Sequence, residues 1–168
     1  MNTKRHLLGI PLILTVIFVF CTSFSDYYPE NWNYIPVFMK RADLENSVSY
    51  RTSAREMENP DKIYYKTPYI YINEKYKGVH VINNSDPRNP VKEGFIVAPG
   101  CIDLAVKGNS MYLDNAVDLV TFDLVSKQVT QRIKNVFPEP VSPENRIYYG
   151  ENKGEYILVE WKKNPDKK

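Results

Sequence analysis

Short runs of alternating apolar and polar residues, separated by turn residues, constrain the fold of this chain more than any other feature. Residues 69–73 and 79–83 alternate with a period of two, the period of a β-strand whose two faces meet different surroundings. The loop between them ends in Gly78, and glycine suits a hairpin position that requires a positive φ. The pattern predicts an antiparallel β-hairpin.

Further runs of the same kind follow, and segments rich in Pro, Gly, Asn and Asp separate them. The chain contains 13 Tyr and 12 Pro but only 7 Gly, a composition that favours strands broken by turns. The predicted fold class is therefore antiparallel all-β. The additional strands are expected at 95–98, 102–106, 111–114, 119–124, 128–133 and 155–161.

The chain also contains an internal repeat. Residues 70–73 align with 111–114 at an offset of 41, and residues 80–83 align with 120–123 at an offset of 40. A repeat of about 40 residues with four short strands is typical of a β-propeller blade. The sequence predicts about two propeller-like blades, which form an incomplete propeller because a closed ring usually needs about four or more.

The first 25 residues have the order of an export signal. Lys4 and Arg5 precede the apolar run 7–20, and small polar residues follow it. This run is shorter than the roughly 20 residues of a membrane-spanning helix. Residues 1–25 are predicted to be a signal peptide or a lipoprotein or membrane anchor.

Cys21 follows the apolar run directly, where a bacterial lipoprotein carries its lipidated cysteine. Lipidation of Cys21 is one interpretation, although Phe20 stands where such signals usually have a small residue. Simple cleavage after Ser23 or Ser25 and an uncleaved anchor are the alternatives. All three place the rest of the chain outside the cytoplasm, in the periplasm or at the cell surface.

The remainder divides into three segments. Residues 26–61 are aromatic, charged and interrupted by Pro, and are predicted to be an extended tether with weak helical turns within 37–58. Residues 62–161 form the predicted β-repeat region, and residues 162–168 form a basic tail.

The charges and motifs argue against several functional classes. The chain has 22 Lys and Arg against 20 Asp and Glu, without the basic stripe that nucleic-acid binding requires, so no nucleic-acid partner is expected. It lacks a Gly-rich phosphate loop, a nucleophilic serine elbow and paired-cysteine metal motifs. We expect no catalytic, cofactor-binding or metal-binding residues, and no cofactor.

The residues with chemical potential each have a structural interpretation. Cys101 is expected to be a buried thiol and His80 a strand residue with a satisfied imidazole. Asp103 interrupts an apolar run, so we expect a buried carboxylate with backbone partners. The acidic residues at strand ends match no calcium loop and are expected to make turn hydrogen bonds: Asp114, Asp118 and Asp123.

Three segments resemble the LVIVD-repeat family of exported proteins from Bacteroidetes. They are KGVHVINNSDPRNP at 77–90, DLAVKGN at 103–109 and LVTFD at 119–123, the last in the place of the motif that names the family. The similarity runs from about residue 34 to 161. It implies a β-propeller-like lipoprotein without an established biochemical activity. Family members are usually longer and carry further blades, so the chain resembles a shortened member.

The predicted function is that of a non-catalytic cell-envelope module that binds an unknown protein or glycan. Its N-terminal segment is predicted to hold it at the membrane. The alternative is a truncated or assembly-dependent fragment of a longer propeller lipoprotein, completed by self-association. An envelope hydrolase that uses acidic residues, with Asp103 as the best candidate, is the third hypothesis.

Overall fold

The structure, a computed structural model, describes residues 32–146 and 154–167. The leader 1–25, with Cys21, lies outside the described residues. The described part is antiparallel β-structure with a single short helix, so the predicted all-β class is confirmed. Its elements are β1 (Tyr34–Lys40), α1 (Arg41–Glu45), β2 (Ser49–Arg51), β3 (Pro60–Lys66), β4 (Tyr69–Glu74), β5 (Gly78–Asn83), β6 (Val91–Val97), β7 (Leu104–Lys107), β8 (Ser110–Asn115), β9 (Asp118–Asp123), β10 (Gln128–Ile133) and β11 (Tyr156–Lys163).

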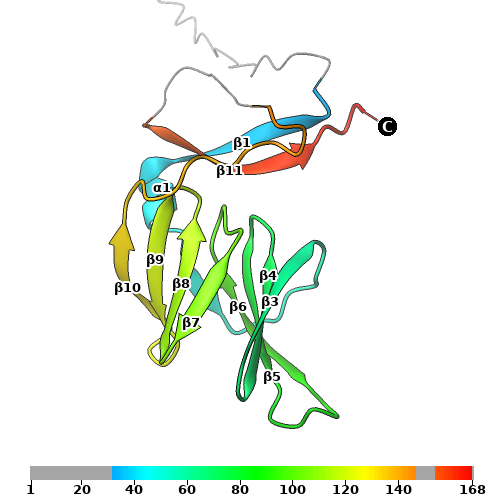
Figure 1. Cartoon of the computed structure of the whole chain (residues 1–168), viewed down its shortest axis with the longest axis vertical. Coiled ribbons are helices and arrows are strands. Elements are labelled where there is room, and N and C mark those ends of the chain that lie inside the picture. The colour runs from blue at the N-terminus through cyan, green and yellow to red at the C-terminus, as the bar shows by residue number, and fades with distance from the viewer. Residues whose placement is uncertain (1–31, 147–153, 168) are drawn as a thin grey trace, which may run out of the picture.

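Two sheets of consecutive strands form the body of the molecule (Figure 1). The first sheet has the order β2-β6-β5-β4-β3, and the second has the order β10-β9-β8-β7. In each sheet, four strands that follow one another in sequence pair antiparallel with their neighbours. Strand β2 adds a fifth strand at the β6 edge of the first sheet.

The internal repeat corresponds to equivalent strands of these two sheets. Strands β4 and β5 pair from Tyr69↔Asn83 to Glu74↔Gly78, and β8 and β9 pair from Ser110↔Asp123 to Asn115↔Asp118. The loop 75–77 has one residue more than the loop 116–117. This difference explains why the offset between the repeats falls from 41 to 40 across the hairpin.

Gly78 is required at the end of the first of these loops, as the sequence predicts. Its φ is +140°, and a Cβ at this position would lie 1.9 Å from the carbonyl oxygen of Ile96 on β6. Any side chain would collide with the neighbouring strand, so only glycine allows β5 to start this close to β6.

The main hydrophobic core lies between the two sheets. We call the faces that meet there the inner faces and the opposite sides the outer faces. The core joins alternate residues of β4, β5 and β6 to alternate residues of β7, β8 and β9, as period-two strands require. Its buried members are Tyr71, Val79, Val81, Ile96, Ala98, Cys101, Val106, Met111, Leu113, Val120 and Phe122.

The segment predicted to be a tether is instead partly folded, which corrects the boundary at residue 61. Strand β1 pairs with β11 along its whole length, with Pro36 opposite Trp161. Proline, which suggested an extended linker, is compatible with this strand because a two-stranded sheet has only edge strands. The short helix α1 lies within the range where weak helical turns are expected.

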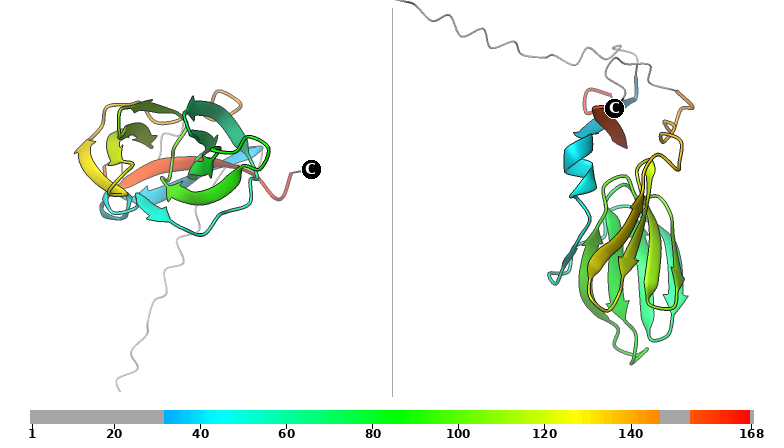
Figure 2. Two further views of the ribbon diagram at one scale, coloured as in Figure 1. Left: turned by 90° about the horizontal axis from the view of Figure 1, so that it is seen from below. Right: turned by 90° about the vertical axis from the view of Figure 1, so that its left-hand side faces the viewer.

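The two-stranded sheet β1-β11 lies across one end of the two large sheets (Figures 1 and 2). Leu44 of α1 is fully buried and packs with Ala116 and Val117 of the β8–β9 loop and with Ile157 and Val159 of β11. The first sheet is attached through an ion pair of 2.6 Å between Lys77 and Glu160. The N-terminal and C-terminal parts of the described chain thus fold together as a cap on both sheets.

Strand β11 ends at Lys163, two residues beyond the predicted strand and inside the predicted basic tail. Its Trp161 is buried, and the indole N–H donates to the carbonyl oxygen of Pro140 at 2.7 Å. Within residues 32–146 and 154–167, no helix has the length and apolar character needed to span a membrane.

Candidate functional site

Cys101 and His80 lie on opposite faces of the first sheet and do not form a nucleophile–base pair. Cys101 is in the core between the sheets, 3.2 Å from Nδ2 of Asn73. Burial raises the pKa of its thiol well above the ordinary value, so it stays protonated. His80 is also buried, but the alternation of β5 directs it away from Val79, Val81 and this core. Both residues have the structural surroundings expected for them.

His80 forms a buried pair with Glu74 on the outer face of the first sheet. Nε2 of His80 lies 3.0 Å from Oε2 of Glu74, and the side chains are 2% and 1% exposed. Burial by itself raises the pKa of Glu74, but hydrogen bonds from His80 and from the backbone amides of Asn59 and Glu58 outweigh it, so the pKa is lowered.

The Glu74–His80 pair holds the segment 55–59 against the outer face. The carboxylate of Glu74 accepts hydrogen bonds from the backbone N–H groups of Glu58 and Asn59. The guanidinium of Arg55 lies 5.5 Å from the centre of the Phe95 ring, which in turn contacts His80 edge-on at 4.8 Å. These contacts give the pair a structural role, because they hold the segment 55–59 over the β5–β6 part of this face.

Asp103 is not buried, which corrects the expectation from the sequence. It precedes β7 in the loop after the core residue Cys101, and its side chain is 60% exposed. The carboxylate forms an ion pair with Lys62 and accepts a hydrogen bond of 2.8 Å from the backbone N–H of Leu104. The apolar run 102–106 is therefore a loop followed by a strand.

Asp123 organises its own turn, as the sequence predicts, whereas Asp114 binds the backbone of the loop before β7. Asp114 accepts hydrogen bonds from the backbone N–H groups of Ile102 and Asp103 at 2.8 and 2.9 Å. Burial raises the pKa of Asp114 despite these bonds. Asp123 accepts bonds from the amides of Val125 and Ser126 in the turn before β10.

Asp118 has a larger role than a turn, and sequence reasoning missed it. Its side chain is fully buried and lies 2.8 Å from Arg41 of α1 and 2.8 Å from Arg132 of β10. Burial opposes ionisation, but Arg41, the amide of Asn135 and Arg132 lower the pKa of Asp118. The carboxylate thereby joins α1, β9 and β10. Among the described residues, no group of three or more His, Cys, Asp and Glu side chains has the arrangement of a metal site.

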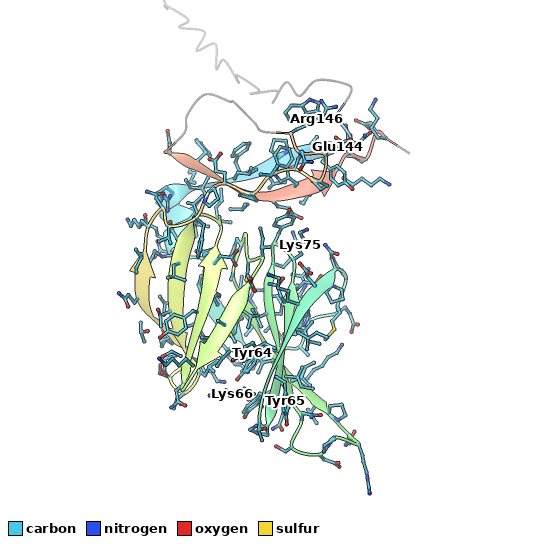
Figure 3. All side chains as sticks on the ribbon, viewed as in Figure 1. Tyr64, Tyr65, Lys66, Lys75, Glu144 and Arg146 are labelled. Carbon is cyan, nitrogen blue, oxygen red and sulfur yellow. The ribbon has the colours of Figure 1, made fainter. Side chains whose placement is uncertain are left out.

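Two neighbouring exposed apolar side chains lie on the outer face of the first sheet. Ile63 and Tyr65 of β3 are 69% and 59% exposed. Tyr64, between them, points the other way, and its hydroxyl donates to the carbonyl oxygen of Val106 on β7 at 2.9 Å (Figure 3). Partly buried isoleucines lie beside the exposed pair on the neighbouring strand β4, because Ile63 pairs with Ile72 and Tyr65 pairs with Ile70.

We call this surface the uncovered face. It extends one strand further to Ile82, which pairs with Ile70. The segment 55–59 covers the neighbouring β5–β6 part, so the uncovered face is centred on β3 and β4. Its residues are Ile63, Tyr65, Ile70, Ile72 and Ile82.

The internal repeat relates this uncovered face to a buried one. At an offset of 41, the outward residues of β3 and β4 correspond to residues of β7 and β8 that pack against the first sheet. At an offset of 40, His80 and Ile82 correspond to Val120 and Phe122 in the same core. The correspondences from β3 and β4 are Ile63 with Leu104, Tyr65 with Val106, Ile70 with Met111, and Ile72 with Leu113.

The reverse correspondence also holds. The inner face of the first sheet corresponds to the outer face of the second, so that Tyr71 matches Tyr112, Val79 matches Leu119 and Val81 matches Thr121. The two sheets therefore pack head to tail: the inner face of the first sheet meets a face of the second sheet that corresponds to the outer face of the first. The β3–β4 part of that outer face, which corresponds to the buried face of the second sheet, remains open to solvent.

Comparison with protein-family models, with curated proteins and with solved structures finds no significant match to this chain.

Proposed function

We propose that the chain is a non-catalytic interaction module of the cell envelope, built from two propeller-like blades and held at the membrane by its N-terminal segment. The observation that carries the binding role is the uncovered face, because exposed apolar patches on protein surfaces can mark interaction sites. Its partner is a protein or a glycan, and Tyr65 suits both, since an exposed aromatic ring contributes apolar area and a polar hydroxyl.

Two features support the blade-like description. Each large sheet contains four consecutive antiparallel strands, as a propeller blade does. The repeat also relates the sheets head to tail, as successive blades of a ring are related. The similarity of 77–90, 103–109 and 119–123 to LVIVD-repeat proteins is a separate, sequence-based reason for the same proposal.

The envelope location rests on the order of Lys4, Arg5, the apolar run and Cys21. We expect the chain in the membrane fraction of the native host, with incorporation of labelled palmitate that disappears in Cys21→Ala. Cys101→Ala is the matched control and should keep the label, because Cys101 belongs to the folded body. Full-length chain in the cytosolic fraction would contradict export.

The binding role predicts that Tyr65 contacts a partner in the envelope. A photoreactive phenylalanine derivative in place of Tyr65 should give a cross-linked species of higher mass on irradiation of intact cells. The same derivative in place of Val125, which is 71% exposed on the β9–β10 loop, should give much less. Equal yields at both positions, or none at position 65, would refute a binding role for the uncovered face.

A further inference from the structure

We propose that the partner of the uncovered face is a second copy of this chain, which docks with the outer face of its second sheet. This inference rests on the proposed interaction role of the uncovered face and identifies what binds there. The two sheets of one chain already pack in this manner, so the contact between copies would repeat the contact within a chain.

The internal repeat specifies which residues would meet. Within the chain, Tyr64 of β3 reaches the backbone of Val106 on β7. The equivalent of Tyr64 in the second sheet is Ala105, and the equivalent of Val106 in the first sheet is Tyr65, both at an offset of 41. Ala105 and Tyr65 are exposed on outer faces. Docking of copies therefore places Ala105 of one copy against Tyr65 of another.

The charges are complementary in this arrangement. Lys62 of the first sheet pairs with Asp103 beside the second, and these positions are themselves equivalent at the offset of 41. If the contact between the sheets is repeated between copies, Asp103 of one copy again comes close to Lys62 of the next copy. Their side chains are 60% and 51% exposed, so each can accept a second partner.

The outer face of the second sheet also has the apolar content that this docking needs. Tyr112 is 37% exposed and stands in the position of the core residue Tyr71. Ile133 of β10 pairs with Leu119 as Ile96 pairs with Val79, so it occupies the equivalent place, and it is exposed. Because the two docking faces differ, the interface is heterologous, and copies can add until a ring closes.

Cross-linking between two different single-cysteine chains tests the proposal. Full-length chains in a Cys21→Ala background carry either Tyr65→Cys or Ala105→Cys, while the buried Cys101 remains protected from the reagent. A short flexible bismaleimide added to the mixture should shift the protein from the monomer to the dimer mass. Neither variant alone should give this shift, and Val125→Cys mixed with Tyr65→Cys is the matched control.

A second pair of cysteine variants tests the same contact at another position. The Nζ of Lys66 bonds to the carbonyl oxygen of Gly108 within the chain, and the equivalent contact between copies joins Lys107 to Thr67. Lys107→Cys and Thr67→Cys chains should therefore cross-link when mixed. Failure of both pairs, with reactive thiols and normal melting, would overturn the proposal. Linkage of Tyr65→Cys to itself would also overturn it, because it would indicate a symmetric dimer.

The proposal and the broader interaction role can fail separately. If the photoreactive group at position 65 captures a different envelope protein and neither mixed pair cross-links, the interaction role stands and self-assembly is wrong. If position 65 captures nothing and no pair cross-links, both are wrong.

Discussion

Removing residues 26–58 should lower the melting temperature of the chain by about ten degrees or more, or cause it to aggregate. The deletion eliminates β1, α1 and β2, and leaves β11 without its partner strand. It also removes Leu44, and loss of a buried leucine side chain alone typically costs about 2–5 kcal/mol. This is a large part of the roughly 5–15 kcal/mol that stabilises a domain.

The experiment compares thermal melts and molecular mass for a chain that begins at Asp26 and for its deletion variants. Deletion of 26–31 is the control, because it leaves β1 and all contacts of the described cap in place. A monomeric protein with an unchanged melt after removal of 26–58 would show that the cap contributes no stability.

The strands that form hairpins could be predicted from the sequence because their partners are adjacent in the chain. The pairing of β4 with β5 and of β8 with β9 depends on local alternation and short loops, and both are visible in the residue pattern. The pairing of β1 with β11 joins the two ends of the described chain. No local pattern specifies such a partner, and Pro36 favoured an extended linker over a strand in the sequence.

The burial of the two sheet faces could not be predicted either. Both faces of β4 are apolar, since Tyr69 and Tyr71 alternate with Ile70 and Ile72. Alternation separates the two sets but does not say which set is covered, and the tertiary packing decides it. The internal repeat, visible in the sequence, contains the information that relates the open face to a buried one, but it becomes useful only once one interface is known.

The role of Asp118 was missed for the same reason. Strand-end aspartates usually bond to their own turn, and Asp123 does so. Asp118 instead binds Arg41, which lies 77 residues away, and Arg132. A single sequence gives no signal for such a pairing, because the three residues come together only after α1 and β10 have packed on β9.

Asp118→Ala should therefore be the most damaging single substitution among the acidic residues. It leaves two largely buried guanidinium groups without their carboxylate, and breaking a buried pair typically costs about 3–5 kcal/mol. Denaturant unfolding should show this loss as a lower midpoint. Asp86→Ala, in an exposed turn, is the matched control and should change the midpoint little. Equal midpoints for the two variants would contradict the structural role of the cluster.

The same cluster predicts that the stability of the fold decreases at low pH. The pKa of Asp118 is lower in the folded chain than its ordinary value of 3.8, so the unfolded state binds the proton first as the pH falls. Its contribution is complete above that value and is lost as the pH decreases through the lower, folded pKa. Asp118→Asn should consequently show a shallower loss of unfolding free energy below about pH 4 than the unmodified chain. Parallel pH profiles for Asp118→Asn and the unmodified chain would mean that the arginines do not stabilise the ionised carboxylate, and the cluster would then act through packing alone.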